Sequence, residues 1–386
     1  MAEEFLKFCS PAISQHTIDE VVSCLKSGWL ATGPRVKQFE ENLKNYLNSP
    51  YVLALNSATA GLHLALKCMG VGKNDEVITT PMTFVASLNA IVHNQAKPIL
   101  VDIDLNTRNI DINKIVAAIT PRTKVIMPVH FAGIPTDLDK IYAIAQKYNL
   151  RVLEDCAHAI GTIYEGKILG SFGDTQVFSF HPNKVMTTGE GGAVATRDEE
   201  LARKISIERF HGIDREAWNR YSKGGNQHYD VIEPGYKYNM MDLQAAIGIH
   251  QLTELEDFIA KRQQLVTRYN EQLADWPELI LPSLPSTKTK HRISWYIYAP
   301  LINKKLVKTT RDEFILKMQE RNIGIGYHHH AAHLYNYYAK TLNHRLGDFP
   351  NAETVSENIC SLPLFASMTF EDQDRIIDAM KKVLKK

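Results

Sequence analysis

The sequence predicts an α/β fold in which a mostly parallel β-sheet is covered by helices on both faces. Six apolar runs rich in β-forming residues alternate with amphipathic stretches through the first two-thirds of the 386-residue chain. These runs span residues 76–81, 97–104, 124–130, 151–156, 176–181 and 192–196. Because parallel strands are joined by crossover helices and are buried on both faces, such alternation is typical of βαβ units.

The stretches between these runs carry helix signals. Thr17 and Glu20 form a capping-box pattern, which predicts a helix over 17–28. Over 136–149, apolar residues recur at helical spacing and predict a second helix; they are Leu138, Ile141, Ile144 and Ala145.

The C-terminal third predicts a second, smaller unit. A helical run over about 241–275 is long enough to connect two units, and the β-like run 294–302 follows it. Thr310 and Glu313 then form another capping box. We therefore expect a large domain over residues 1–245 and a small α+β domain over residues 246–386. The polar, aperiodic stretch 210–235 predicts a long functional loop.

The composition excludes several classes of protein. Lys and Arg number 44 against 43 Asp and Glu, so the chain lacks the positive charge expected of a nucleic-acid-binding protein. No apolar run reaches the roughly 18 residues of a membrane span, and the acidic N-terminus does not resemble a secretion signal. The five cysteines are widely spaced, which indicates neither a disulfide framework nor a thiolate zinc site. We expect a cytoplasmic protein.

The most informative segment is Ser179-Phe-His-Pro-Asn-Lys184, which follows a predicted strand and precedes the glycine-rich stretch 187–192. A lysine that loses hydration in such a turn has a lowered pKa and becomes nucleophilic. A Schiff-base lysine needs that property. A solvated loop lysine is the alternative, and this segment alone does not separate the two.

Asp155 lies near the end of the predicted strand 151–156, and Lys184 follows the later strand 176–181. In a parallel sheet both residues should emerge at the carboxyl edge, where ligands bind. An aspartate there can keep the ring nitrogen of pyridoxal phosphate protonated, and His158 could support the aspartate or the ring. Helix capping and ordinary polar packing are the alternatives for these two residues.

Small and hydroxylated residues, Asn56-Ser-Ala-Thr-Ala-Gly61, precede an apolar helical stretch. Free amides at a helix N-terminus form a natural phosphate site, although ordinary capping uses the same residue types. Pro81-Met-Thr-Phe84 opens a further helix. Phe84 could present its flat face to a cofactor ring, or it could belong to the core.

In this order, and each at the end of a strand, these elements resemble the DegT/StrS family of nucleotide-sugar aminotransferases. These are fold-type I enzymes that depend on pyridoxal phosphate. The resemblance covers essentially the whole chain and includes the motifs at 27–34, 128–133, 154–159 and 361–364. It implies a large domain with a mostly parallel seven-stranded sheet, and a homodimer whose subunits share their active sites.

The resemblance implies a role for each matching position. Lys184 would bind the cofactor covalently and then move a proton between the cofactor and the sugar carbon. Asp155 would pair with the ring nitrogen, while Phe84 and His158 would contact the ring. The cofactor phosphate would be held by four residues, namely Ser57, Ala58, Thr59 and Ser179.

In this family a segment of the other subunit completes each site, commonly Gly-Tyr-Asn-Tyr-Arg-Met; here it is Gly235-Tyr-Lys-Tyr-Asn-Met240. Lys237 is therefore expected to reach the partner's phosphate, with Asn239 as the alternative. The sugar pocket would be lined by Trp29, Thr32 and Gly33, and His328 would contact the diphosphate of the nucleotide sugar. We expect no metal at the cluster formed by His328, His329, His330 and His333, which lacks carboxylates and cysteines.

The leading hypothesis is transfer of an amino group from L-glutamate, which becomes 2-oxoglutarate, to C4 of a UDP-4-keto sugar. The motif variants favour UDP-4-keto-pentopyranose, giving UDP-4-amino-4-deoxy-L-arabinose for modification of lipid A or another cell-surface polysaccharide. Phe84 stands where that branch often has tryptophan, so UDP-, dTDP- or GDP-linked 4-keto-6-deoxyhexoses are an alternative. A non-catalytic sensor of pyridoxal phosphate or nucleotide sugar is another. Lys184 and Asp155 argue against the sensor, because a retired enzyme would be expected to lose them.

Overall fold

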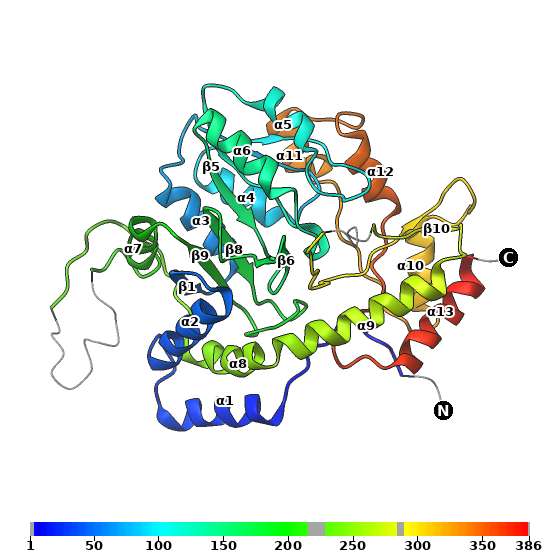
Figure 1. Cartoon of the computed structure of the whole chain (residues 1–386), viewed down its shortest axis with the longest axis horizontal. Helices are drawn as coiled ribbons and strands as arrows, with labels where there is room; N and C mark the ends of the chain where they lie inside the picture. Colours follow the sequence, from blue (N-terminus) through cyan, green and yellow to red (C-terminus); the bar gives the residue numbers. More distant parts are fainter. Residues whose placement is uncertain (1–3, 215–227, 284–288, 385–386) are drawn as a thin grey trace.

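The computed structural model describes residues 4–214, 228–283 and 289–384. Its main β-sheet, which has seven strands, lies between layers of helices (Figure 1). The strand order is β1-β9-β8-β5-β4-β2-β3, and β9 is antiparallel to both of its neighbours whereas the other pairs are parallel. The strands are β1 (Tyr51–Leu55), β2 (Glu76–Thr79), β3 (Lys97–Leu100), β4 (Thr123–Ile126), β5 (Arg151–Asp155), β8 (Thr175–Ser179) and β9 (Gly192–Thr196). The predicted α/β fold is confirmed. All six predicted runs contain strands, and β1 is a seventh that the alternation pattern did not predict.

Helices bury both faces of this sheet. Val177 of β8 packs in one cluster with α3 (Ala58–Cys68) and α7 (Glu199–Glu208). Its neighbour Phe178 packs on the opposite face with α2 (Pro34–Leu47) and α8 (Asp242–Thr253). Because successive side chains of a strand point to opposite faces, a strand covered on both sides is apolar throughout. The other helices of this part are α4 (Val85–His93), α5 (Ile112–Ala118) and α6 (Leu138–Tyr148).

The predicted helices are present, but only one of the three predicted starts is right. α10 (Arg311–Gln319) begins with the capping box of Thr310 and Glu313, as predicted, whereas α6 begins after Asp137, two residues later than the predicted range 136–149. The capping box predicted at Thr17 is wrong, because α1 (Gln15–Ser27) begins earlier. Ser14 is its N-cap and accepts a hydrogen bond from the Thr17 amide at 3.3 Å, so the earlier of two capable residues caps the helix.

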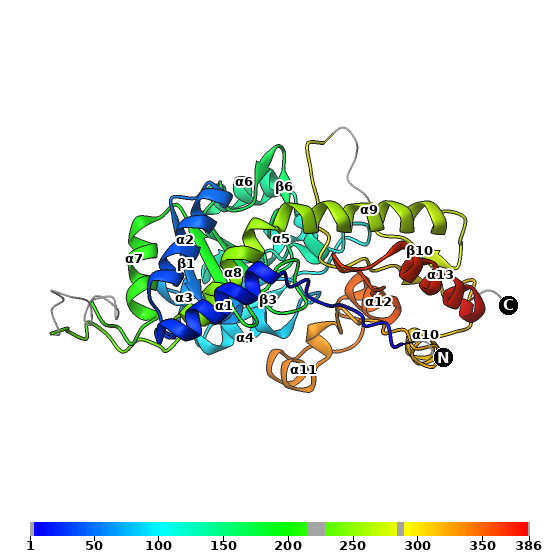
Figure 2. The same cartoon turned by 90° about the horizontal axis from the view of Figure 1, so that it is seen from below.

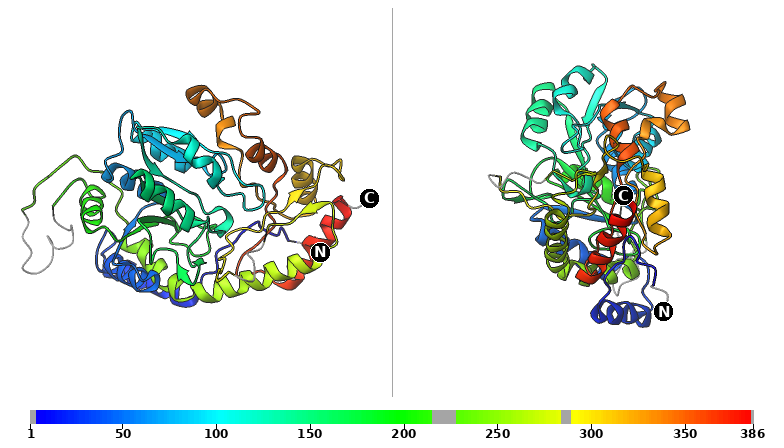
Figure 3. Two further views of the ribbon diagram at one scale, coloured as in Figure 1. Left: turned by 45° about the horizontal axis from the view of Figure 1, so that its top comes forward. Right: turned by 90° about the vertical axis from the view of Figure 1, so that its right-hand side faces the viewer.

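The predicted connecting helix consists of two helices, α8 and α9 (Leu255–Leu273), which are separated at Glu254. The C-terminal elements follow α9. β10 (Leu279–Ile280), β11 (Leu301–Ile302), α10 and α13 (Phe370–Leu384) lie toward one end of α9 (Figure 3). α11 (Asn336–Leu342) and α12 (Pro350–Asn358) lie away from that end and pack against the part that holds the sheet, where the Ala352 amide donates to Asp102 at 2.9 Å. The domain boundaries at 1–245 and 246–386 stay a prediction.

The N-terminal segment also reaches this C-terminal part. It runs from α1 along the underside of the molecule toward α10 and α13 (Figure 2). Leu6 forms a parallel bridge with Ile323, and the Arg375 guanidinium donates to the Glu4 carbonyl at 2.9 Å. Of the predicted loop 210–235, residues 215–227 lie outside the described residues. Within the described ranges, no helix combines the length and apolar character needed to cross a membrane.

Candidate active site

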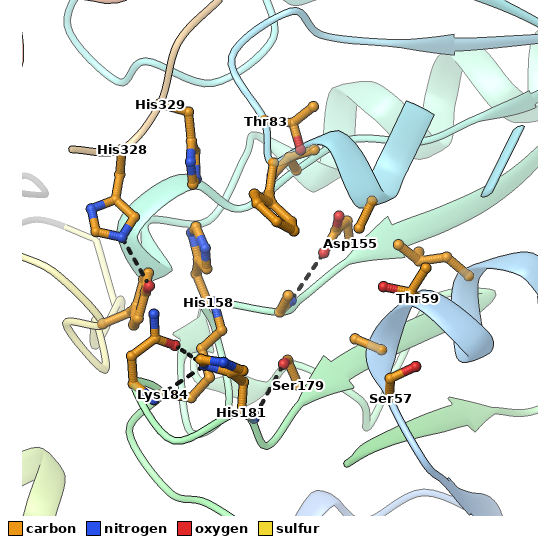
Figure 4. Close-up of a pocket in the computed structure, with 18 of the residues that line it drawn as sticks. Ser57, Thr59, Thr83, Asp155, His158, Ser179, His181, Lys184, His328 and His329 are labelled. Carbon is orange, nitrogen blue, oxygen red and sulfur yellow. Dashed lines mark hydrogen bonds between the residues drawn. The ribbon is translucent and has the colours of Figure 1, made fainter. Parts of the chain in front are cut away.

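A pocket of about 390 Å³ lies at the carboxyl ends of β5 and β8 (Figure 4). The segments that line it follow β1, β2, β5 and β8, and a loop at 327–329 closes it from the C-terminal part. Ligands of open α/β sheets bind at this edge. Most of the predicted site residues line the pocket, namely Ser57, Ala58, Thr59, Phe84, Asp155, His158, Ser179, Lys184 and His328.

Asp155 is held in one orientation. It ends β5, is only 5% exposed, and each of its carboxylate oxygens accepts a hydrogen bond. The Ser87 hydroxyl donates to Oδ2 at 2.7 Å, and the Ala157 amide donates to Oδ1 at 3.1 Å. A buried carboxylate fixed in this way can pair with a protonated ring nitrogen without reorganising.

Lys184 lies in the turn after β8, and its Nζ lies 4.0 Å from the centroid of the Tyr296 ring. Burial lowers the pKa of Lys184 to about 7, although the charge of Asp155 acts in the opposite direction. A substantial fraction of the amine is therefore neutral near pH 7, as a nucleophile requires. Tyr296 is buried and comes from the C-terminal part, and the sequence reasoning missed it.

Ser57, Ala58 and Thr59 form the N-terminal start of α3. The Ser57 hydroxyl accepts from the Ala60 amide at 3.1 Å, and the Gly61 amide makes the first intrahelical bond, to the Ser57 carbonyl. The amides of Ala58 and Thr59 precede that bond, which is the arrangement found where helix N-termini bind anions. A side chain at Gly192 would bring its Cβ to 2.4 Å from the Ala58 nitrogen, so glycine lets β9 pass close to this turn.

These groups form a donor set that fits pyridoxal phosphate. Amides and hydroxyls, including that of Ser179, lie at one side of the pocket, and the Asp155 carboxylate and the Lys184 amine complete it (Figure 4). The phosphate of this cofactor needs an anion-binding site, and its ring nitrogen needs a carboxylate. Its aldehyde needs a nucleophilic amine. The roles predicted for the individual residues stay predictions, because no bound group is described.

Two further predicted residues border the pocket with rings. His158 is buried, and its Nδ1 accepts from the Ala132 amide at 3.3 Å, so the neutral ring carries its proton on Nε2. Burial, with the nearby Lys184 and His329, lowers the pKa of His158 well below its ordinary value. Phe84 lines the pocket and is 60% exposed, which leaves its ring available to a bound group.

Both ring nitrogens of His328 have protein partners. Its Nε2 lies 3.1 Å from the Tyr296 hydroxyl and its Nδ1 lies 2.9 Å from the Ser361 hydroxyl. Burial and the nearby Lys184 lower the pKa of His328 to about 3. His328 thus holds Tyr296 beside Lys184, and its predicted contact with a diphosphate stays a prediction that would require one of these bonds to break.

The remaining predicted residues lie together outside the pocket, and we call them the loop cluster: Trp29, Thr32, Gly33, Lys237 and Asn239. The Trp29 indole donates to the Thr32 carbonyl at 3.1 Å. The Thr32 hydroxyl donates to the Met240 carbonyl and accepts from the Asn239 amide. The loop cluster therefore joins two segments that lie about 200 residues apart.

Gly33 has a packing role in the loop cluster. A Cβ at Gly33 would lie 2.1 Å from the Trp29 ring nitrogen, so the loop closes only around glycine. The Asp242 carboxylate, at the start of α8, accepts from the amides of Arg35 and Val36 and so caps α2. Lys237 lies with its Nζ 4.4 Å from the centroid of the Phe210 ring. The loop cluster lies beside the start of α3. The backbone amide of Asn56, which precedes Ser57, donates to the carbonyl of Tyr238, which lies between Lys237 and Asn239, at 2.8 Å.

His330 and His333 form hydrogen bonds with different residues. His330 Nδ1 lies 3.3 Å from the Tyr327 hydroxyl, and His333 Nε2 lies 2.9 Å from Glu353. Within the described ranges, metal-ligand spacing occurs at a different place, among His130, Glu154 and Cys156. There His130 already binds Glu154 through Nε2 at 2.9 Å and accepts from the Thr136 amide, so its two nitrogens are engaged.

The fold and the pocket together define a fold-type I aminotransferase that depends on pyridoxal phosphate. The chain belongs to the DegT/DnrJ/EryC1/StrS aminotransferase family, whose model matches residues 11–381.

Relatives match along almost the whole chain. It is 47% identical over 382 residues to the uncharacterized protein MJ1066 of Methanocaldococcus jannaschii, which covers 99% of this chain and 98% of that protein. It is 44% identical to the spore coat polysaccharide biosynthesis protein SpsC of Bacillus subtilis, covering 99% and 97%. The PLP form of the putative sugar aminotransferase Spr1654 of Streptococcus pneumoniae has a TM-score of 0.90 at 32% identity, covering 99% and 98%.

Proposed function

We propose that this protein transfers the amino group of L-glutamate to C4 of a UDP-4-keto sugar, and that the sugar is UDP-4-keto-pentopyranose. The product would be UDP-4-amino-4-deoxy-L-arabinose, a precursor for modification of lipid A or another cell-surface polysaccharide. The observation that carries the proposal is the pocket in which an amine with a pKa of about 7, a fixed carboxylate and a phosphate cradle lie together.

The residues of this chain would divide the chemistry between them. Pyridoxal phosphate, when bound, supplies the electron sink that carries the amino group between donor and acceptor. The start of α3 and Ser179 would hold its phosphate, and Asp155 would hold the proton on its ring nitrogen. The neutral Lys184 Nζ would take a proton from the donor carbon and later deliver a proton to the sugar carbon, as a general acid and base.

The motif variants support the pentose. The form Gly235-Tyr-Lys-Tyr-Asn, together with the segments at 27–34, 324–333 and 359–365, is most similar to the branch that aminates UDP-4-keto-pentopyranose. The name of the B. subtilis relative, which concerns spore coat polysaccharide, supports a role in making a surface polysaccharide. The five cysteines are all unpaired, which supports a reducing, cytoplasmic location.

We also propose a homodimer that completes each site. Lys237 would reach the phosphate in the partner subunit, and Trp29, Thr32 and Gly33 would line the assembled sugar pocket. Two features of the loop cluster support this: the Asn239 Oδ1 is buried with no hydrogen-bond partner among the described residues, and the apolar side chains of Leu30 and Met241 are exposed. A second copy of the chain would cover those side chains.

The test is the visible absorption spectrum of the purified holoenzyme. Its cofactor band should bleach with L-glutamate and return after addition of UDP-4-keto-pentopyranose. If the band bleaches but returns only with dTDP-4-keto-6-deoxyglucose, the aminotransferase stands and the pentose is wrong. If glutamate does not change the band, the proposed amino donor is wrong. If no amino acid changes the band of the bound cofactor, the protein is instead the non-catalytic sensor of pyridoxal phosphate or nucleotide sugar. The Lys184→Ala variant is the control.

A further inference from the structure

His329 borders the pocket with a polar atom that has no partner. It lies next to His328 and is only 9% exposed, and its Nε2 is buried with no hydrogen bond in the described structure. Its neighbours differ in this respect, because His328 uses both nitrogens and His158 uses Nδ1. Buried polar atoms nearly always have a partner, so an unpaired one at a pocket wall is available to a group bound in the pocket.

The ring of His329 lies among the side chains predicted to contact the cofactor. Its centroid is 5.8 Å from that of His158, with the planes 24° apart, and 5.9 Å from that of Phe84. Figure 4 shows the rings of His329 and His158 pointing toward one another at one side of the pocket, on the opposite side from Ser57 and Thr59. His329 thus lies at the end of the pocket away from Ser57 and Thr59.

The imidazole of His329 is uncharged. Burial, with the nearby His328 and Lys184, lowers its pKa well below the ordinary value. A neutral imidazole offers one donor and one acceptor, which complements a hydroxyl group. A carboxylate, which only accepts, is better bound by a cation.

We propose that His329 is a specificity-determining residue, whose Nε2 forms a hydrogen bond with a hydroxyl group of the keto sugar. This inference rests on the proposed function, and it assigns His329 to the sugar half of the reaction. The glutamate half should not depend on it, because glutamate presents carboxylates and no hydroxyl.

The experiment compares His329→Phe with His329→Gln in single-turnover measurements of the two half-reactions. Phenylalanine keeps a ring of similar size without nitrogens, whereas the glutamine amide nitrogen lies near the position of Nε2. His329→Phe should lower the kcat/KM for UDP-4-keto-pentopyranose by about 10-fold to 100-fold, which is typical of a lost polar contact. In the same variant, the rate constant of the glutamate half-reaction should change by less than about twofold. His329→Gln should recover most of the wild-type kcat/KM for the sugar half-reaction.

His330→Phe is the matched control in the same loop, because the His330 ring turns to Tyr327 and Tyr335. A second readout does not depend on turnover. Calorimetry with the holoenzyme and UDP-xylose, which keeps the pentose hydroxyls but cannot react, should show weaker binding to His329→Phe than to His329→Gln.

The outcomes separate this inference from the function on which it rests. If the wild-type protein does not react with glutamate, the proposed function fails. If the wild type completes both halves and His329→Phe matches it in the sugar half, only the role of His329 is wrong. Equal losses in both halves would also overturn it, since that result assigns His329 to the cofactor. If the wild type accepts only dTDP-4-keto-6-deoxyglucose, the same comparison is made with that sugar.

Discussion

The pocket and the loop cluster contain the two halves of the predicted site, and they are built in different ways. In the pocket, Asp155 and Lys184 follow neighbouring parallel strands, so the sheet brings them to one edge. In the loop cluster, Thr32 and Asn239 bind each other across about 200 residues of chain and line no part of the pocket among the described residues. One chain therefore assembles the groups that line the pocket, whereas the loop cluster would contribute to a site only in the proposed homodimer.

The largest expected effect tests the pocket. Lys184→Ala should lower the rate of amino transfer by about 10²-fold to 10⁴-fold, because the amine that is proposed to move the proton is lost. Steady-state assays measure the rate, and mass spectrometry after borohydride reduction should find no cofactor attached to the chain. Lys237→Ala is the matched control and should still become labelled. A Lys184→Ala variant that retains normal turnover would contradict the mechanism.

A smaller loss is expected from Asp155→Asn. The amide keeps the size of the side chain and can still accept from Ser87, but it no longer carries the charge that stabilises a protonated ring nitrogen. Removal of such a preorganised group costs about 10²-fold to 10³-fold in kcat. Stopped-flow absorbance of the glutamate half-reaction measures it, with Ser87→Ala as a milder control. A variant as fast as the wild type would remove Asp155 from the mechanism.

Variants of Lys237 in the loop cluster and of Lys184 in the pocket test whether the two residues act in the same site across two subunits. Lys237→Ala should lower activity about tenfold if Lys237 makes one charged contact with phosphate. Mixing it with Lys184→Ala under conditions of subunit exchange should raise activity to about a quarter of the wild-type value, since half of the dimers would be hybrids with one intact site of two. No recovery despite verified exchange would mean that Lys237 serves its own chain.

The smallest expected effect concerns stability. The folded pKa of Lys184 is lowered to about 7, below its unfolded value near 10.5, so the unfolded chain binds more protons between these pH values. Stability of the cofactor-free protein should therefore rise relative to Lys184→Met as pH increases from 7 to 9, by about 1 to 2 kcal/mol. Urea unfolding of both proteins measures the difference.

Lys237→Met is the comparison variant for this experiment. Burial also lowers the pKa of Lys237, but its side chain is better solvated, so its pH-dependent difference should be smaller. A difference that falls with pH in Lys184→Met would contradict the lowered pKa of Lys184.

The strands could be predicted because their signal is local. A strand buried on both faces is a short apolar run, and six such runs were recognisable from the sequence. The start of α1 was predicted wrongly because Ser14 and Thr17 are both capable caps, and local sequence does not decide between them.

In the C-terminal wall of the pocket, sequence reasoning predicted His328 but missed the residues around it. Tyr296, Ser361 and His329 belong to segments far from Lys184 in the chain, and no spacing rule connects a tyrosine with a lysine more than 100 residues away. The signal available for His329 was the run of three histidines at 328–330, which did not indicate which ring would lack partners.

The sequence by itself determined the α/β class, the strand ends near Asp155 and Lys184, and the helix start at residues 57–59. These features depend on the alternation of apolar runs and on the residue types at their ends, which are properties of neighbouring residues. The tertiary structure alone decided that Tyr296 lies beside Lys184, that both His328 nitrogens have partners while His329 Nε2 has none among the described residues, and that the loop cluster lies outside the pocket. Those outcomes depend on how distant segments pack together, because burial and partners exist only once the chain is folded.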